Sequence, residues 1–517
     1  MADSRTQVAI VGGGPVGLGL AVELGQRGVA TTVVEKTAEI HRIPKGQNLT
    51  QRTMEHFRSW GIDAAIRAAR VMPPAYPAVG VNAYGNLMSE YAHPWFRRSD
   101  VDSFYFAANE RLPQYATEAI LRKRGGALEH VDARFGLSAI GVDQDGDRAY
   151  VTTSREVIEA DYVVGCDGSR SLVREHAGIG ETRSDHDRRM VLLVFRSRQL
   201  HDILDGRFGH AAFFNVLHPE LDGYWRFLGT VDAAENWFFH APVPPTATAD
   251  NVDAGALLRA AVGVDVAMEV DYMGFWDLRI AIAETYQQGR IFVAGDAAHS
   301  HPPYGGYGIN TGLEDARNLG WKLAAVLKGW APARILDSYS EERRAVFAST
   351  ARDFIESFIE NDRVFVAHHN PDIDKEDFEK AWETRRAGST RAVNVFEPHY
   401  EGSRLVFGPA GGESSAVGSH TMTARAGHHL PPSDEGLFDM LGHDFCLVTG
   451  ADNDADAFIT AADILGVPLT VARVSDKALS DYQTSMILVR PDHYVVWTGD
   501  RAVRADAEAV LRRATGT

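Results

Sequence analysis

The 517-residue sequence predicts an α/β protein with more than one domain, and three observations support this prediction. The chain is longer than a single hydrophobic core usually accommodates, so two or three domains are expected. Residues 7–36 follow a pattern of strand, glycine turn, helix and strand. Residues 183–278 instead contain short aromatic and β-branched runs that are typical of a separate sheet, namely "RMVLLVF", "AAFFNVL", "YWRFLGTV" and "NWFFHAP".

Composition is that of an ordinary globular protein, with 45% apolar and 24% charged residues and a formal net charge of −18. Because no dense basic run occurs, we expect neither nucleic acid nor a membrane surface as a partner. The two cysteines, Cys166 and Cys446, stand in unrelated segments, which argues against disulfides and against a CxxC redox or zinc site. No apolar stretch reaches the ~18 to 20 residues of a spanning helix, and the first strand begins almost at once, so we expect a cytoplasmic protein.

Residues 7–36 contain a dinucleotide-binding pattern. A short apolar strand precedes Gly12, Gly14 and Gly17, which form G-x-G-x-x-G, and Glu35 closes the next strand. Gly12 would allow the tight turn, Gly14 would let the backbone approach a pyrophosphate, and Gly17 would let the helix pack on the strand. The helix N-terminus would favour the phosphates, and an acid about 20 residues on could accept hydrogen bonds from a ribose. This Rossmann-like unit does not by itself distinguish FAD from NAD.

Two later segments also follow predicted strands. Residues 161–174, "DYVVGCDGSRSLVR", are an apolar strand, an Asp-Gly pair and a helix start. Residues 291–310, "IFVAGDAAHSHPPYGGYGIN", end a strand at an Asp and continue into a loop with three glycines in four residues. A helix follows, with apolar residues at steps of three and four up to Gly329. Such a bare loop suits a flat or charged ligand that must contact the backbone.

In this order and at these intervals, the three segments resemble the fingerprint set of class A flavin-dependent aromatic hydroxylases. This is the family of para-hydroxybenzoate hydroxylase, phenol hydroxylase and hydroxybiphenyl monooxygenase. Residues 295–312 resemble its G-D-A-A-H-x-x-P-P-x-G-G-x-G-x-N-x-G signature residue for residue, and residues 335–347 resemble the stretch that follows. The resemblance covers residues 1–350 strongly and the last 110 more loosely. It implies a Rossmann-like FAD-binding domain with an inserted β-sheet substrate domain and a C-terminal thioredoxin-like domain.

The resemblance also implies the cofactor contacts. Asp296 would bond a ribityl hydroxyl, the loop 302–308 would lie against the isoalloxazine, and the helix beginning near Ile309 would direct its positive end at the flavin. Asp167 would support the pyrophosphate region and NAD(P)H handling. Arg111 could assist, or could be a solvated helix charge. The expected cofactor-binding residues are Gly12, Gly14, Gly17, Glu35, Lys45, Arg52, Gln114, Asp167, Asp296, Gly305, Gly306, Gly308, Ile309 and Asn310. His299 and His301 have no further ligand cluster nearby, so no metal site is predicted.

The implied reaction has two halves. NAD(P)H reduces FAD, and O2 then forms a C4a-hydroperoxide that transfers oxygen to a carbon ortho or para to a phenol oxygen. A base that deprotonates the phenol would help, yet Gln47 stands where phenol hydroxylases carry Asp or His, and Lys45 replaces the usual Arg. Gln cannot accept a proton, although its amide can donate to an oxyanion.

Two interpretations of Gln47 remain open. The substrate could be an acidic, electron-poor phenol, such as a nitrophenol or nitrocatechol, that binds as its anion. Alternatively, the base lies elsewhere, at Tyr224, His210 or His240. The catalytic candidates are therefore Gln47, Tyr224 and His210, together with Pro303 in the flavin loop.

The substrate pocket is expected beneath the sheet of residues 183–278, which in the family covers the flavin. Its candidates are Phe213, Phe214, Trp225 and Phe227, although each could simply pack in the core. The predicted partners are a small aromatic molecule and O2. Two other functions stay open: a flavin monooxygenase of a polyketide, antibiotic or alicyclic substrate, and a pyridine-nucleotide dehydrogenase without oxygen chemistry. A non-catalytic flavoprotein is a more distant option.

The C-terminal third begins with a charged helical segment and the glycine-rich stretch 408–420, which reads as a linker. Strand, helix, strand and hairpin then resemble the family's thioredoxin-like tail, which would be structural or dimer-forming because it lacks CxxC. The predicted domain boundaries are 1–182 and 279–345 for FAD binding, 183–278 with a contribution from 76–101 for the substrate sheet, 346–410 for the helical segment and linker, and 411–517 for the tail.

Overall fold

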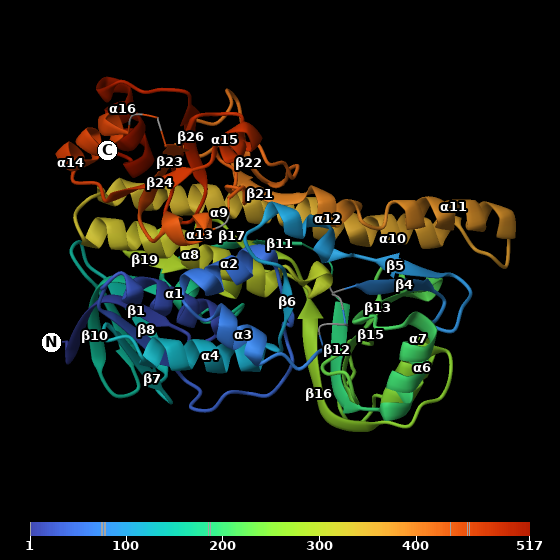
Figure 1. Ribbon diagram of the computed structural model, residues 1–517. Helices are drawn as coiled ribbons and strands as arrows, with labels where there is room; N and C mark the ends of the chain where they lie inside the picture. The colour runs from blue at the N-terminus through green and yellow to red at the C-terminus, as the bar shows by residue number, and fades with distance from the viewer. Residues whose placement is uncertain are drawn as a thin grey trace.

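The computed structural model describes residues 2–517 apart from residues 74, 75, 77, 78, 185, 187, 435, 452 and 454. Figure 1 shows the N-terminal domain at lower left, a second sheet domain at lower right, and the C-terminal domain above the first. Long helices run across the molecule between the C-terminal domain and the two sheets below it (Figure 1). The chain therefore forms the mixed α/β architecture that the sequence predicts.

The first domain is built on a mainly parallel sheet with the strand order β18-β19-β10-β1-β2-β7, and β9 and β8 extend from β10. Helix α1 packs between α4 and α8. Parallel strands covered on both faces need apolar residues throughout, and residues 8–11 of β1 are accordingly buried. The elements are β1 (Ser4–Val11), α1 (Pro15–Gln26), β2 (Thr31–Glu35), α2 (Gln51–Ser59), α3 (Asp63–Ala68), α4 (Gln114–Gly126), β7 (Val131–Phe135), β8 (Ala139–Gln144), β9 (Ala149–Thr153), β10 (Val157–Gly165), α5 (Leu172–His176), β18 (Gln287–Gln288), β19 (Ile291–Val293) and α8 (Gly308–Leu327).

Short strands join this domain to the next. β3 (Asn48–Leu49) pairs with β6 (Glu110–Arg111), and β17 (Ala281–Ala283) pairs with β11 (Glu181–Arg183) and β20 (His299–Ser300). The pairing of β3 with β6 brings the loop at residues 45–50 next to the start of α4.

The second sheet has the order β16-β12-β15-β14-β13-β4-β5 and is antiparallel except between β13 and β4. Helices α6 (Arg198–Phe208) and α7 (Ala254–Val262) contribute to the apolar core on one face. Strands β4 and β5 come from the segment 76–101, of which residues 77 and 78 lie outside the described residues. The strands are β4 (Gly80–Tyr84), β5 (Ala92–Trp95), β12 (Arg188–Arg196), β13 (Phe213–Leu217), β14 (Arg226–Thr230), β15 (Asn236–Val243) and β16 (Glu269–Leu278).

The segment that leads to the C-terminal domain consists of helices and one hairpin-like pair. The helices are α9 (Asp337–Ser349), a π-helical stretch (Thr350–Glu356), α10 (Ser357–His368), α11 (Lys375–Ala387) and α12 (Arg391–Val395). Strand β21 (Phe396–Tyr400) then pairs with β22 (Ser414–Val417). The glycine-rich stretch predicted as a linker thus contains a paired strand, because glycines there form the turn that brings β22 back to β21.

The C-terminal domain has the strand order β24-β23-β25-β26, with β24 parallel to β23 and the other pairs antiparallel. This is the thioredoxin-like arrangement that the sequence predicts. Its elements are α13 (Leu437–Leu441), β23 (Phe445–Gly450), α14 (Asp456–Leu465), β24 (Leu469–Val474), α15 (Asp476–Tyr482), β25 (Met486–Val489), β26 (Val495–Gly499) and α16 (Arg504–Thr515).

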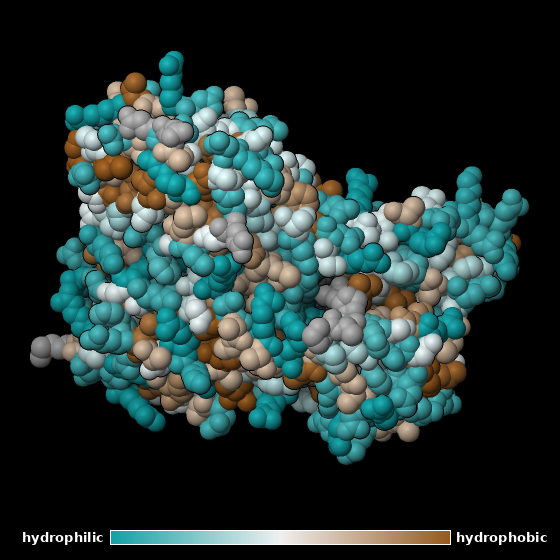
Figure 2. All heavy atoms as spheres, viewed as in Figure 1, coloured by the Kyte–Doolittle hydropathy of each residue, from teal (hydrophilic) through white to brown (hydrophobic). Residues whose placement is uncertain are grey.

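The C-terminal domain shares a hydrophobic core with the first domain. Trp321 of α8 meets Phe445 of β23 edge to face, with 5.9 Å between the ring centroids. On the outside, Figure 2 shows hydrophilic residues over most of the viewed face and scattered hydrophobic patches. Across the described residues, no helix is both long and apolar enough to cross a membrane.

Candidate active site

The glycine turn between β1 and α1 has three positions with different surroundings. Gly12 has a φ of 109°, and a Cβ atom there would lie 2.3 Å from the Cys166 carbonyl oxygen. A Cβ atom on Gly17 would lie 2.0 Å from the Gly12 carbonyl oxygen. At Gly14, by contrast, a Cβ atom would meet nothing within 4 Å among the described residues beyond its chain neighbours. The turn therefore packs tightly yet leaves one open approach to the backbone, as a pyrophosphate requires.

Two helices point uncapped N-termini at the same space. Helix α1 begins after Gly14 and α8 after Tyr307, and neither has a side-chain cap or an acidic residue in its first turn. Gly14, Gly308 and Ile309 all line one cavity. Free N–H groups and the positive dipole ends there favour phosphates and a negatively charged ring edge.

Hydrogen bonds from Arg98 and Asn310 fix the backbone of the bare loop at residues 302–308. Gly305 and Gly306 adopt φ values of 69° and 65°, which favour glycine. The Arg98 guanidinium donates to the Gly305 carbonyl, and the Asn310 Nδ2 donates to the Gly306 carbonyl at 2.7 Å. These contacts fix the loop backbone while leaving Gly305 and Gly306 on the cavity wall.

A single cavity of about 390 Å³ extends from the glycine turn, past this loop, to the second sheet. Twelve residues of the predicted site lie on its wall. They are Gly14, Lys45, Gln47, Gln114, Phe213, Phe227, Asp296, Pro303, Gly305, Gly306, Gly308 and Ile309. Three sequence motifs and the second sheet therefore converge on one space, although they are far apart in the chain.

Polar groups at the glycine-turn end are free to bind a ligand. The Asp296 side chain is exposed to the cavity, and desolvation by the surrounding protein raises its pKa. Lys45, also on the wall, attracts the carboxylate. No hydrogen-bond donor reaches Asp296 in the part of the chain that the structure describes. A free carboxylate beside the open turn suits a polyhydroxyl chain.

The far end of the cavity is an aromatic wall on the second sheet. Phe213 of β13 and Phe227 of β14 lie 6.0 Å apart between ring centroids, and Phe238 of β15 lies 5.6 Å from Phe227. Trp95 and His240 complete this wall. Such a surface suits a flat apolar ring.

Four residues that were predicted to contact the cofactor make hydrogen bonds within the protein. The Glu35 carboxylate accepts the Gly13 and Thr37 amides, each at 2.7 Å, and Asp167 accepts the Ser171 hydroxyl at 2.5 Å and the Val173 amide at 3.2 Å. Both Asn310 amide atoms are used, because Oδ1 accepts from Thr50 and Thr53 and Nδ2 donates to Asn48 and Gly306. None of these three residues, nor Arg52, lies on the cavity wall.

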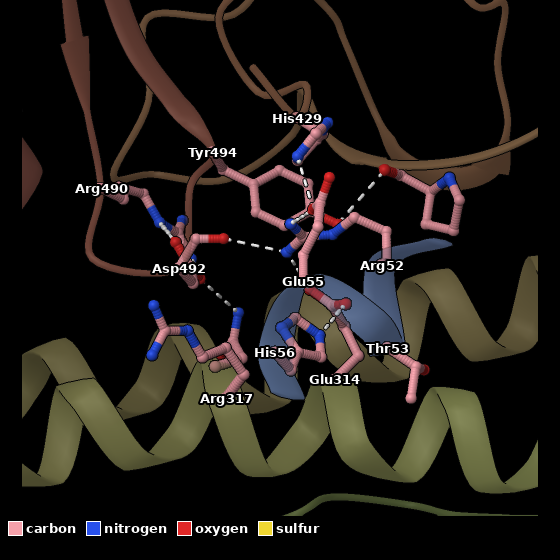
Figure 3. Close-up of polar contacts among 12 residues, drawn as sticks. Arg52, Thr53, Glu55, His56, Glu314, Arg317, His429, Arg490, Asp492 and Tyr494 are labelled. Carbon is pink, nitrogen blue, oxygen red and sulfur yellow. Dashed lines mark hydrogen bonds and ion pairs between the residues drawn. The ribbon is translucent and has the colours of Figure 1, made fainter. Parts of the chain in front are cut away.

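Arg52 belongs instead to a buried ion network between α2, α8 and the C-terminal domain (Figure 3). Its guanidinium donates to Glu55 at 2.6 Å, to Glu314 at 3.2 Å and to the Asp492 carbonyl at 3.0 Å. His429 Nε2 lies 2.9 Å from a carboxylate oxygen of Glu55. The expectation of a cofactor contact is therefore corrected, because both terminal nitrogens of Arg52 are hydrogen-bonded within this network and Arg52 does not line the cavity.

Four predicted catalytic or pocket residues also lie elsewhere. The Tyr224 hydroxyl donates to the His186 carbonyl at 3.1 Å, and His210 pairs with Asp205 at 2.9 Å with an exposed ring. Trp225 packs against Tyr304 of the loop 302–308, with 4.4 Å between the ring centroids. Phe214 points to the opposite face of its strand, because side chains alternate, and packs near α6. Arg111 is not a solvated helix charge, since it is buried in β6.

Sequence reasoning missed several wall residues, among them Trp95, Phe96, Phe238 and His301. The alternation in "NWFFHAP" could have placed Phe238 and His240 on one face of their strand. Phe96, by contrast, has a φ of 58°, an uncommon backbone state that no sequence signal announces.

A separate histidine cluster lies near β21, although no metal site was expected. The ligand atoms of His399, Glu401 and His428 lie within 4.8 Å of one another. His428 already bridges two carboxylates, with Nδ1 2.8 Å from Glu397 and Nε2 2.8 Å from Glu401. Both ring nitrogens of His428 therefore have a carboxylate partner within the protein.

Comparison with known proteins agrees with this geometry. A family model described as an FAD binding domain matches residues 5–353, and another described as the C-terminal part of aromatic-ring hydroxylases matches residues 423–517. The chain is 31% identical to the 4-methyl-5-nitrocatechol 5-monooxygenase of Burkholderia sp, over 98% of this chain and 96% of that protein. It is 29% identical to the tetracenomycin A2 monooxygenase-dioxygenase of Streptomyces glaucescens, over 100% and 99%. The rebeccamycin biosynthetic enzyme RebC with reduced flavin superposes with a TM-score of 0.84 at 27% identity, over 99% of each chain.

The open Gly14 approach, the uncapped helix ends and the free Asp296 carboxylate fit FAD. Fold and site together define a flavoprotein monooxygenase. The chain belongs to the FAD-dependent aromatic hydroxylases, the class A flavin hydroxylase family that its motifs resemble.

Proposed function

We propose that the protein consumes NAD(P)H and O2 to hydroxylate a phenolic or heteroaromatic small molecule. The single cavity carries this proposal, because it extends from the glycine turn between β1 and α1, past the loop 302–308, to the aromatic wall on the second sheet. FAD supplies, when bound, the electrons that activate O2 for transfer to the substrate ring.

The chain's own residues would divide the work along the cavity. Gly14 and the start of α1 would hold the pyrophosphate, and Asp296 and Gln114 would hold the ribityl chain. The start of α8 would stabilise negative charge on the ring edge that faces it. Phe213 and Phe227 would orient the substrate ring and exclude water.

The wall provides little for deprotonating a phenol. Tyr224 and His210 are not on it, and burial lowers the pKa of His240 to about 4. The Trp276 indole N–H donates to His240 Nδ1 at 3.2 Å, so the neutral ring carries its proton on Nε2. His301 donates from Nδ1 to the Pro302 carbonyl at 2.6 Å, and burial lowers its pKa to about 4 as well. This arrangement favours substrates that ionise without a strong base, such as nitrophenols or nitrocatechols, and the nitrocatechol relative is in keeping with that class.

A second candidate is a polyketide or antibiotic substrate, which the tetracenomycin-related relative favours. Rapid-mixing measurements of NADH and NADPH oxidation by the holoenzyme separate the two candidates. Acceleration of flavin reduction by a nitrophenol or nitrocatechol, with a hydroxylated product, is expected. If only a polycyclic polyketide accelerates reduction and yields product, the second candidate replaces the first.

A further inference from the structure

Arg111 is a buried cation on the cavity wall whose partners are all neutral. Its side chain is 7% exposed and lies at the end of β6. The guanidinium donates to the Thr230 carbonyl at 2.7 Å, to the Thr230 hydroxyl at 3.2 Å and to Gln47 Oε1 at 3.3 Å. Burial lowers the pKa of Arg111 to about 10, so the side chain is still protonated at neutral pH. A buried charge without a counter-ion is costly to keep.

Other buried arginines in this chain are compensated by carboxylates. Arg317 pairs with Glu23 at 2.6 Å, and Arg343 pairs with Asp315 at 2.7 Å. Among the buried arginines that the structure describes, Arg98 and Arg111 alone lack such a partner. Arg98 is enclosed by the rings of Phe96 and Tyr307, whereas Arg111 lines the open cavity. The missing negative charge at Arg111 can therefore come from a ligand.

The neighbouring side chains present donors as well. Gln47 Nε2 is buried and has no hydrogen-bond partner in the described part of the chain, whereas the Gln47 oxygen accepts from Arg111. His240 presents its Nε2 proton, since Trp276 occupies Nδ1. The acidic side chain on the wall, Asp296, lies at the glycine-turn end. Two donors and a fixed cation thus stand on the same wall as the aromatic rings.

We propose that Arg111, together with the Gln47 amide, forms an anion-binding subsite that selects the ionised form of an acidic phenol. This inference rests on the proposed function, and it names the charge state of the substrate. Arg111 would pair with the phenolate oxygen, and Gln47 Nε2 would donate the second hydrogen bond. Binding the anion keeps the ring electron-rich and leaves no proton for a base to remove, which explains why Gln47 can replace an acid or histidine.

The test compares holoenzyme with Arg111→Met, Arg111→Lys and Gln47→Leu variants. Equilibrium binding of 4-nitrocatechol, catechol and 4-nitrobenzoate is measured by perturbation of the flavin absorbance between pH 6 and 9. For the wild type, 4-nitrocatechol should bind more tightly as the pH rises through its first ionisation. Arg111→Met should weaken that binding about 10- to 100-fold and abolish its pH dependence, with catechol at neutral pH nearly unaffected. Arg111→Lys should retain part of the affinity, and Gln47→Leu should lose less than Arg111→Met.

Each other outcome has a definite meaning. Equal weakening of 4-nitrocatechol and catechol in Arg111→Met, or loss of bound FAD with unchanged discrimination, overturns the inference. Selective loss of 4-nitrobenzoate binding alone also overturns it, because the subsite would then serve a carboxylate. If the wild type binds the nitrocatecholate through Arg111 but hydroxylates no phenol, the proposed function fails while the anion subsite stands.

Discussion

Replacing Gly14 with alanine should weaken FAD binding while leaving the cofactor-free fold nearly intact. The added Cβ atom would meet no described atom within 4 Å beyond its chain neighbours, and the backbone angles of −75° and −177° suit alanine. Because Gly14 is the N-cap of α1, alanine there should cost roughly 0.5 to 1 kcal/mol of stability. The methyl group would instead occupy the approach to the helix N-terminus.

The expected loss of FAD affinity follows from the contacts that the methyl group blocks. Hydrogen bonds from backbone N–H groups to a charged phosphate contribute about 1.5 to 3 kcal/mol. Losing one such contact corresponds to a rise in Kd of roughly 10- to 100-fold. Titration of the apoprotein with FAD, followed by quenching of flavin fluorescence, measures this Kd, and urea unfolding of the apoprotein measures stability.

Gly17→Ala is the matched control, because its Cβ atom would lie 2.0 Å from the Gly12 carbonyl oxygen. Helix α1 would have to shift, so we expect a loss of about 1 to 3 kcal/mol or more in the apoprotein itself. Wild-type FAD affinity in Gly14→Ala would refute the reasoning. So would an apoprotein of Gly14→Ala as unstable as that of Gly17→Ala.

Three further predictions concern single side chains. Asp296→Asn, which keeps the shape of the side chain but removes its charge, should yield protein with reduced flavin content on purification; full flavin content would show that this carboxylate does not hold FAD. Arg52→Met should lower the free energy of unfolding by about 3 to 5 kcal/mol, because the buried Glu55 and Glu314 carboxylates would lose the arginine they share, and loss of FAD at unchanged stability would restore a cofactor role. The pKa of His240 in the folded state is about 4, below the usual 6.5 of an unfolded chain. Because the unfolded state therefore binds the proton first as the pH falls, the free energy of unfolding should drop by about 2 kcal/mol between pH 7 and pH 5. His240→Gln should remove that part of the acid sensitivity in urea unfolding, and an unchanged difference between the two pH values would contradict the assignment.

The cofactor end of the site could be predicted from the sequence because its chemistry depends on backbone. Gly12, Gly14 and Gly17 can be recognised in the sequence because the turn requires residues without side chains. Their spacing defines a local turn that tertiary contacts hardly change. The same holds for Gly305 and Gly306 in the flavin loop. The role of a side chain in the same motif also depends on its neighbours in the fold. Asn310 stands in the right motif, yet its amide is consumed by Asn48, Thr50, Thr53 and Gly306.

The substrate end depends on how distant strands are paired, and one sequence does not give that register. Phe213 and Phe214 are equivalent in the sequence, but only Phe213 faces the cavity because the pairing of β13 with β14 sets the direction of alternation. Arg111 reads as the start of a charged helix, whereas pairing of β6 with β3 buries it beside Gln47. That Arg111 has no carboxylate partner follows only from the fold, which places Thr230 of β14 beside it.

The C-terminal domain packs against α8, the helix whose first residues line the cavity. Cys446 is buried, and burial raises the pKa of its thiol to about 11, so a reactive thiolate is disfavoured. The loop between β25 and β26 instead reaches α8, where the Pro491 carbonyl accepts from Arg317 at 2.5 Å and the Asp492 carboxylate accepts from Trp321 at 3.1 Å. Because the other end of α8 forms the cavity wall at Gly308 and Ile309, this loop fixes the helix whose N-terminus faces the flavin site. The buried network in Figure 3 is therefore the structural link between the domain that lacks a redox motif and the site that binds the cofactor.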